Sequence, residues 1–308
     1  MVCKGVSQTK KIFFMSNTKN SPLITGLSQI IDRYDGFILD LWGCIHNGVE
    51  PFPGVLDALK RARVAGKKLL VVSNAPRRAT SVADSMAKLG VDPTLVDDIL
   101  SSGEATWQAL VDRDDPWHAA LGRRGLHIGP DRDIGLFAGS GVERVSDPAA
   151  ADFVLATGPL DDSFGLAEHE GLLQACRKRG LKLLCANPDL DVIRGATRLI
   201  CSGTLAARYR EIGGDTREHG KPQPAIYDRA MQMIGIADRT RVAAVGDSFR
   251  TDIAGARGAG IDAVFIPGGI HAEGMGFRHG DVPSAAAIAT LAAEHKVSPT
   301  WVLPDLRW

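Results

Sequence analysis

Three aspartates that follow apolar runs are the residues of this sequence best suited to chemistry. Asp40 ends the run GFILD, Asp247 directly follows the run RVAAVG, and Asp252 stands five residues further on. Apolar runs of this length predict fully buried strands, so each carboxylate is expected at a strand tip or in the loop behind it. Carboxylates gathered in one place repel one another unless a cation is present, and Mg²⁺ prefers oxygen ligands. The pattern therefore predicts a magnesium site.

A hydroxyl and an ammonium complete a set of groups that could transfer a phosphoryl group. Ser73 ends the run KKLLVVS, and the backbone amides after it, from Asn74 onward, are placed to hold phosphate oxygens at a helix start. Lys221, in the run HGKP, could bring a positive charge to both the Asp40 carboxylate and the phosphoryl group. Asp40 would attack phosphorus and form an aspartyl-phosphate, which divides one hard displacement into two easier ones. Taken alone, residues of these types are more often helix caps, turn formers or solvated surface residues.

Alternating strands and helices are needed to bring these residues together. Strands are expected at 36–40, 67–73, 241–246 and 262–266, and helices at 55–65, 82–89 and 253–260. This alternation predicts a parallel, doubly wound α/β sheet, whose ligands lie beyond the carboxyl ends of the strands. The aspartates and Ser73 all fall at that edge.

A second set of alternating elements occupies the middle of the chain. Apolar runs predict strands at 126–128, 153–157 and 181–186, with a helix at 166–179. This is enough for a second α/β domain inserted into the first. The predicted division is a core domain at 21–80 and 212–308, an inserted domain at 81–211, and a disordered tail at 1–20, in which Met15 could be the physiological start.

In their order along the chain, four short stretches resemble the motifs of the haloacid dehalogenase (HAD) superfamily of phosphotransferases. They are DLWG at Asp40, SN at Ser73, KP at Lys221, and GDS with TD around Asp247 and Asp252. The run ANPD at 186–189, followed by SGT at 202–204 and HGKP at 219–222, is similar to the class IIA branch with its large α/β cap domain. That branch includes sugar-phosphate, nucleotide and pyridoxal-phosphate phosphatases.

The resemblance implies a role for each matched residue. The catalytic residues would be Asp40, Ser73 and Lys221. Mg²⁺ would be bound directly by Asp40, the backbone carbonyl of Trp42 and Asp247, and supported through water by Asp252. A small phosphorylated metabolite would be bound by Ser73, Asn74, Asn187 and Asp189. Asn187 and Asp189 fit an ordinary Asn-Pro-Asp turn equally well.

Trp42 departs from the pattern of the superfamily. Its phosphatases usually carry a second aspartate two positions after the nucleophile, which acts as general acid and then as general base. Position 42 is tryptophan here, and indole has no titratable proton to give. Loss of a general acid typically costs about 100-fold to 10,000-fold in rate.

Three hypotheses follow from this departure. The substrate could have a good leaving group, or another group such as His46 or water could supply the proton. The reaction could be one that needs no acid, such as dehalogenation, although Asp247 and Asp252 would then have no purpose. The chain could instead be a catalytically weak relative that binds a phosphorylated ligand. We favour a magnesium-dependent phosphohydrolase, because Asp40, Ser73, Lys221 and Asp247 are all present.

The overall composition is that of an ordinary globular protein. The formal net charge is zero, 44% of the residues are hydrophobic and 23% are charged, with no Lys/Arg-rich run. We therefore expect no nucleic-acid partner and no membrane partner. The five scattered cysteines indicate reduced thiols and hence the cytoplasm. A homodimer through the cap domain is a further prediction.

Overall fold

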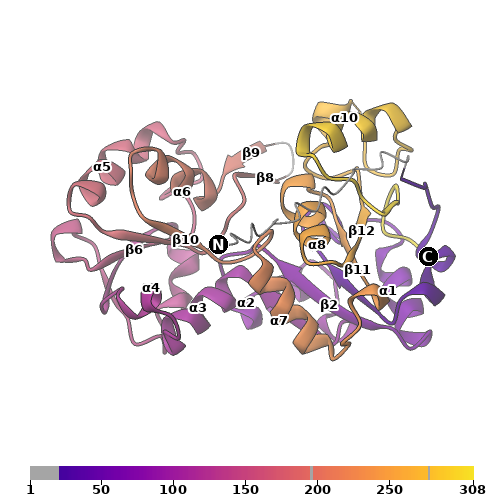
Figure 1. Cartoon of the computed structure of the whole chain (residues 1–308), viewed down its shortest axis with the longest axis horizontal. Coiled ribbons are helices and arrows are strands. Elements are labelled where there is room, and N and C mark those ends of the chain that lie inside the picture. The colour runs from indigo at the N-terminus through magenta and orange to yellow at the C-terminus, as the bar shows by residue number, and fades with distance from the viewer. Residues whose placement is uncertain (1–20, 195–196, 277) are drawn as a thin grey trace, which may run out of the picture.

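The computed structural model describes residues 21–194, 197–276 and 278–308, and the predicted tail at 1–20 lies outside these ranges. Figure 1 shows two lobes, one containing β2, β11 and β12 and the other containing β6 and β10. Each lobe is built on its own parallel sheet with helices packed against it. This confirms the predicted fold class, a doubly wound α/β core with a second α/β unit inserted into it.

A six-stranded sheet forms the core lobe, and all of its pairings are parallel. The strand order is β13-β12-β11-β1-β2-β3. The strands are β1 (Gly36–Leu39), β2 (Lys68–Ser73), β3 (Asp98–Ser101), β11 (Val242–Gly246), β12 (Asp262–Phe265) and β13 (Trp301–Val302). From β1 the chain moves outward through β2 and β3, and later it returns to the other side of β1 at β11. Doubly wound sheets open a crevice at such a reversal, beyond the carboxyl ends of the strands.

Helices cover both faces of this sheet. They are α1 (Val55–Val64), α2 (Ala79–Lys88), α3 (Ser102–Asp112), α7 (Pro224–Ile234), α8 (Ala254–Gly258), α9 (Ala272–Met275) and α10 (Ala285–His295). Leu39 and Val71 point into an apolar cluster with α1 and α2, whereas their neighbours Ile38 and Leu70 point into a second cluster with α7, α8 and α10. Because strand side chains alternate, a sheet buried on both faces needs uninterrupted apolar runs, as β1 and β2 have.

The inserted lobe has a five-stranded parallel sheet of order β10-β7-β6-β4-β5. Its strands are β4 (Arg124–Ile128), β5 (Glu143–Val145), β6 (Phe153–Ala156), β7 (Lys182–Cys185) and β10 (Thr216–Glu218). Its helices are α4 (Pro116–Ala119), α5 (Glu170–Lys178) and α6 (Ser202–Glu211). An antiparallel pair, β8 (Asp191–Arg194) and β9 (Thr197–Ile200), extends from this lobe toward the core lobe (Figure 1).

Strand pairing moves both boundaries of the inserted domain away from the predicted positions, 81 and 211. The β3 strand pairs with β2, so the core continues past residue 81, and α2 also packs on that sheet. At the other end, β10 pairs with β7, so the inserted sheet continues past residue 211. The local pattern of a strand does not state which sheet it joins, because pairing depends on residues distant in sequence.

Among the described residues, no helix combines the length and the apolar character that crossing a bilayer requires.

Tyr209 offers a test of how the inserted lobe is held together. Its ring is fully buried on α6, and its hydroxyl donates to the carbonyl oxygen of Leu181 at 2.6 Å, just before β7. We expect Tyr209→Phe to lower the free energy of unfolding by about 1–3 kcal/mol, because a buried acceptor loses its donor. Urea unfolding would measure this. Val64→Ala, at a side chain that is 90% exposed, is the control and should change stability by less than about 0.5 kcal/mol.

Candidate active site

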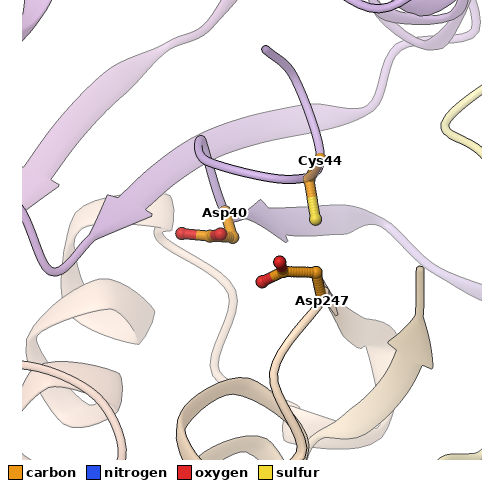
Figure 2. A group of neighbouring side chains, drawn as sticks. All are labelled: Asp40, Cys44 and Asp247. Atoms are coloured by element: carbon orange, nitrogen blue, oxygen red, sulfur yellow. The ribbon is translucent and has the colours of Figure 1, made fainter. Parts of the chain in front are cut away.

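Asp40 and Asp247 lie side by side at the crevice of the core sheet. Each is the first residue after its strand, and β1 and β11 are neighbours with Leu39 opposite Val245. The backbone amide of Asp40 donates to the carbonyl oxygen of Val245 at 2.9 Å. Both side chains are buried, and both face the space beyond the strand ends (Figure 2). The structure therefore brings together two carboxylates that are more than 200 residues apart in sequence.

Lys221 lies against two of the three predicted carboxylates. Its Nζ is 2.5 Å from Asp40 Oδ1 and 2.7 Å from Asp252 Oδ1, and the residue is only 3% exposed. Burial alone would lower the pKa of this lysine, but the Asp252 and Asp40 carboxylates raise it well above its usual value. Lys221 is therefore a permanent positive charge at the bottom of the site.

Asn74 fixes the backbone of Lys221. The Asn74 amide donates through Nδ2 to the carbonyl oxygen of Lys221 at 3.1 Å and accepts through Oδ1 from its N–H at 2.8 Å. Ser73, the last residue of β2, is buried beside it and accepts through Oγ from the N–H of Ala75 at 3.2 Å. Among the described residues the Ser73 hydroxyl donates no hydrogen bond, so its proton can be donated to a ligand. Ser73 and Asn74 thus line the same cleft as Lys221.

Neighbouring backbone and side-chain atoms pack closely around the Asp247 carboxylate. Its Oδ2 accepts from the backbone N–H of Ile270 at 2.7 Å, and methyl groups added at Gly43 or Gly269 would collide with the carboxylate. Cys44, which is not among the residues that the sequence predicts for the site, points its thiol at Asp247 (Figure 2). One ligand atom from each of Asp40, Cys44 and Asp247 lies within 4.8 Å of the others. The only sequence signal for Cys44 is its position in the turn that follows Asp40.

The carboxylates of the site are buried, and the charge of Lys221 does not fully balance theirs. Burial raises the pKa of Asp40 to about 7, although Lys221 lowers it. Burial, followed by the charges of Asp40 and Asp252, raises the pKa of Asp247 well above its usual value. One ammonium thus faces three carboxylates, which leaves room for a further positive charge. Buried carboxylate oxygens are the ligands that hard divalent cations prefer, so these residues fit such an ion.

Asp252 differs from the other two carboxylates in its contacts. Besides Lys221, it accepts from the backbone N–H of Ser248 at 3.2 Å through Oδ2. Both of its oxygens are therefore engaged by the protein, and it does not belong to the group of ligand atoms around Asp40 and Asp247. This arrangement is compatible with the predicted role of supporting an ion indirectly.

The indole of Trp42 packs inside the turn that follows Asp40. Its ring lies edge-on to His46, with ring centroids 5.1 Å apart, and a methyl group at Gly48 would collide with it. His46 is buried and accepts through Nδ1 from the N–H of Gly48 at 3.1 Å. Burial lowers the pKa of His46 to about 4, so the imidazole is neutral near pH 7. These contacts make His46 a residue that shapes the turn.

The ANPD run of the inserted domain reaches the core site. Asp189 accepts through Oδ1 from Asn74 Nδ2 at 2.9 Å, and Arg250 donates to the carbonyl oxygen of Pro188 at 2.8 Å. Asn187 Oδ1 accepts from the N–H of Asp189 at 3.0 Å, which is the hydrogen bond of an ordinary Asn turn. Asn187 therefore shapes the turn, and Asp189 is the residue of the run whose side chain contacts the core.

Both lobes line a single cavity of about 1220 Å³ over this site. Its floor carries Asp40, Ser73, Lys221 and Asp247, and its roof carries Asp189 and the β8–β9 pair. A parallel α/β core with an acidic, lysine-containing crevice under an inserted α/β domain is typical of a hydrolase that binds an anionic group together with a divalent cation.

Comparisons with known proteins agree with this class. Models of haloacid dehalogenase-like hydrolases match residues 37–143 and 139–260, and a HAD-hydrolase-like model matches residues 218–308. The crystal structure of a haloacid dehalogenase-like hydrolase from Brucella suis 1330 shares 33% identity and a TM-score of 0.78, covering 92% of this chain and 100% of that one. The chain belongs to the haloacid dehalogenase-like hydrolase family, and it is a HAD-type hydrolase with class IIA-like relatives.

A curated relative connects the family to phosphate esters. The D-glycerol 3-phosphate phosphatase of Mycobacterium tuberculosis is 29% identical over 290 residues, which cover 91% of this chain and 72% of that protein. Glycerol phosphate phosphatase from the same organism has been solved in complex with calcium, with 27% identity, a TM-score of 0.61, and coverage of 78% of this chain and 68% of that one. These relatives support a phosphohydrolase that uses a divalent cation.

The raised pKa values of Asp40 and Asp247 predict how stability depends on pH. Both carboxyls hold protons more tightly when folded, so without metal the free energy of unfolding falls as pH rises from about 4, the usual aspartate value, toward and beyond 7. A divalent cation binds the ionised forms and opposes this loss. We expect added Mg²⁺ to raise Tm more at about pH 7.5 than at about pH 5.

Thermal unfolding with EDTA and with Mg²⁺ at both pH values measures the effect. Asp247→Asn should lose most of the increase in Tm that Mg²⁺ produces. Equal Mg²⁺ effects at the two pH values would show that these carboxyls do not hold the ion.

Proposed function

We propose that this chain is a magnesium-dependent phosphohydrolase that cleaves a small phosphorylated metabolite through an aspartyl-phosphate on Asp40. The observation that carries the proposal is the 2.5 Å contact between Lys221 Nζ and Asp40 Oδ1, next to Asp247 on the floor of the cavity. A carboxylate held in this way is oriented, and among the described residues no hydrogen bond reaches its second oxygen. That oxygen is available to attack phosphorus.

Each neighbour of Asp40 has a defined part in this reaction. Lys221 attracts both the carboxylate and the three charged oxygens of the phosphoryl group. The Ser73 hydroxyl and the backbone amides after β2 can donate to those oxygens. Asp40, the Trp42 carbonyl and Asp247 would hold Mg²⁺, with Asp252 in support, and the bound ion would neutralise charge on the carboxylates and on the phosphoryl group.

A small metabolite fits the dimensions of the site. The cavity of about 1220 Å³ exceeds the space a phosphate needs, so a leaving group of substantial size can lie between the floor and the β8–β9 pair. Several relatives carry the names of phosphatases that act on small molecules, such as acid sugar phosphatase and 5'-nucleotidase. Glycerol 3-phosphate and sugar phosphates are therefore the first esters to assay.

The cellular setting remains a proposal. Four cysteines, Cys44, Cys176, Cys185 and Cys201, are free and buried, which is typical of a reducing compartment such as the cytoplasm. The predicted homodimer through the inserted domain, and the predicted lack of nucleic-acid and membrane partners, stay predictions.

Trp42 favours a second candidate, a protein that binds a phosphorylated ligand and turns it over weakly. A panel of sugar, nucleotide, vitamin and glycerol phosphates separates the two candidates when activity and Tm are measured in parallel. Ligands that raise Tm without being hydrolysed would support the binding protein.

Asp40→Asn is the direct test of the nucleophile. We expect it to lower kcat by at least about 1,000-fold, since the amide cannot form the covalent intermediate, while the ligand still raises Tm. Acid quenching of the wild-type enzyme during turnover of a ³²P-substrate should trap label on the protein, and Asp40→Asn should trap none. Retention of label by the variant would place the nucleophile elsewhere.

Gly269→Ala tests whether Asp247 holds the ion. The added methyl group would collide with the Asp247 carboxylate, so we expect Mg²⁺ affinity, measured by isothermal titration calorimetry, to fall at least about 10-fold. Gly274→Ala is the matched control, because a methyl group at that position meets nothing within 4 Å. Unchanged Mg²⁺ affinity in Gly269→Ala would move the ion away from Asp247.

A further inference from the structure

Among the described residues on the floor of the site, none is suited to give a proton to the leaving group. An alcohol leaving group needs a proton as the P–O bond breaks, and the indole at position 42 cannot give one. His46 is unsuited, because its pKa falls to about 4 and its Nδ1 already accepts from Gly48. His271 is unsuited for the same reasons, since burial lowers its pKa to about 4 and its Nε2 accepts from the N–H of Phe249.

Two carboxyls of the cavity wall are also committed elsewhere. Asp133 forms an ion pair with Arg77 at 2.9 Å and is buried. Asp162 is held by both Arg132 and Arg194, at 2.6 Å and 2.9 Å, and the hydrogen bond from Arg132 lowers its pKa. The lowered pKa of Asp162 makes it unsuited to give a proton near neutral pH. Burial raises the pKa of Asp133, but Arg77 binds that carboxyl, and among the described residues it makes no hydrogen bond to Asn74 or Lys221.

Asp189 has the position that a proton donor needs. Its side chain is 31% exposed and lines the cavity above the Asp40 floor. Asn74 binds Asp189 and also the backbone of Lys221, whose Nζ contacts Asp40, so one amide ties the Asp189 carboxyl to the nucleophile's own partner. The charge of Asp189 also acts on Asp40. A leaving group on a phosphoryl at Asp40 would extend from the floor toward this roof.

The charged groups that act on Asp189 come from the core lobe. Arg250 lies 3.7 Å away, and Lys221 and Asp252 act from the floor. Cys201, on the inserted lobe, is a neutral thiol because burial raises its pKa. Burial raises the pKa of Asp189, and this effect outweighs the Asn74 hydrogen bond and the charges of Lys221 and Arg250, which lower it. The carboxyl therefore holds a proton at higher pH than an ordinary aspartate does.

We propose that Asp189 is the general acid and general base of this enzyme, in place of the aspartate that position 42 lacks. The inference rests on the proposed function. In the first step Asp40 forms its bond to phosphorus, the ester P–O bond breaks, and the Asp189 carboxyl gives its proton to the departing oxygen. In the second step Asp189 takes a proton from water as that water attacks phosphorus, which breaks the bond to Asp40 and releases phosphate.

A consequence is that the acid is present only when the lobes are together. The contacts that hold Asp189 over the floor, the Asn74 hydrogen bond and the Arg250 ion pair, both cross between the core and the inserted lobe. Closure would complete the reacting groups and exclude water in the same movement.

Asp189→Asn tests the proposal, because the amide keeps an acceptor for Asn74 and loses the proton. We expect kcat/KM for glycerol 3-phosphate, whose alkoxide needs protonation, to fall about 100-fold to 10,000-fold. The kcat/KM for p-nitrophenyl phosphate should change little, because nitrophenolate departs without a proton. Its kcat should fall, since the second step lacks a base, and stopped flow should show a burst of nitrophenolate.

A control variant and a rescue variant complete the test. Asp191→Asn removes a carboxylate from the same segment of the cavity wall, one that pairs with Arg198 at 2.8 Å, and should keep the wild-type dependence on leaving group. Adding Trp42→Asp to Asp189→Asn should restore part of the lost kcat/KM for glycerol 3-phosphate.

Three results would overturn the inference. An equal loss for both esters through KM would make Asp189 a binding residue only. If Asp189→Asn does not fold, Asp189→Ser takes its place, and equal effects on both esters would again count against the proposal.

The wild-type enzyme separates this inference from the proposed function. If it turns over no ester, the proposed function fails and this inference fails with it. If it turns over both esters and Asp189→Asn changes neither rate, this inference alone fails.

Discussion

The contact of Lys221 with Asp40 and Asp252 is the interaction on which the site depends. Three carboxylates and one ammonium are removed from water here, and an incompletely paired charge in a dry site is costly. The protein tolerates this because the surrounding backbone is fixed. Asn74 holds both the N–H and the C=O of Lys221, so the backbone from which the ammonium extends is fixed beside the carboxylates. The remaining negative charge is what attracts a divalent cation to the site.

Close packing around Asp247 gives the same site its precision. The turn with Gly43 and the loop with Gly269 approach this carboxylate from opposite segments of the chain, and neither position can carry a side chain without moving it. The N–H of Ile270 then fixes Oδ2. Rigid backbone, and not side-chain freedom, therefore determines where the carboxylate points, as the proposed role of a metal ligand would require.

Most of the fold could be predicted from local pattern, and the residues that meet in the cleft could be predicted from the joint order of four motifs that resemble those of the HAD superfamily. Apolar runs with polar tips indicate parallel strands and the edge at which Asp40, Ser73 and Asp247 meet. Pairing is non-local, so neither the membership of β3 in the core sheet nor that of β10 in the inserted sheet could be predicted. The two-residue strand β13 is too short to carry a pattern.

Side-chain direction was the other limit of prediction. Asn187 and Asp189 stand two residues apart in one turn, and the sequence gives no reason to separate them. The structure turns Asn187 inward to hold the N–H of Asp189, and turns Asp189 toward Asn74 in the core. Cys44 likewise faces Asp247 only because the turn after Asp40 folds back, with the N–H of Ile45 donating to the carbonyl oxygen of Leu41 at 2.8 Å.

With tryptophan at position 42, the proposed assignment divides the chemistry between the two lobes. In the turn after Asp40, the indole packs against His46 and Gly48 and helps to hold the backbone that carries Asp40. A carboxyl at that position would stay beside the nucleophile whether the lobes are open or closed. A carboxyl on the inserted lobe, as at Asp189, reaches the leaving group only through contacts that cross to Asn74 and Arg250. With Asp189 as the proposed acid, the contacts that form on closure would also place the proton, and hydrolysis would be slow while the cavity is open to water.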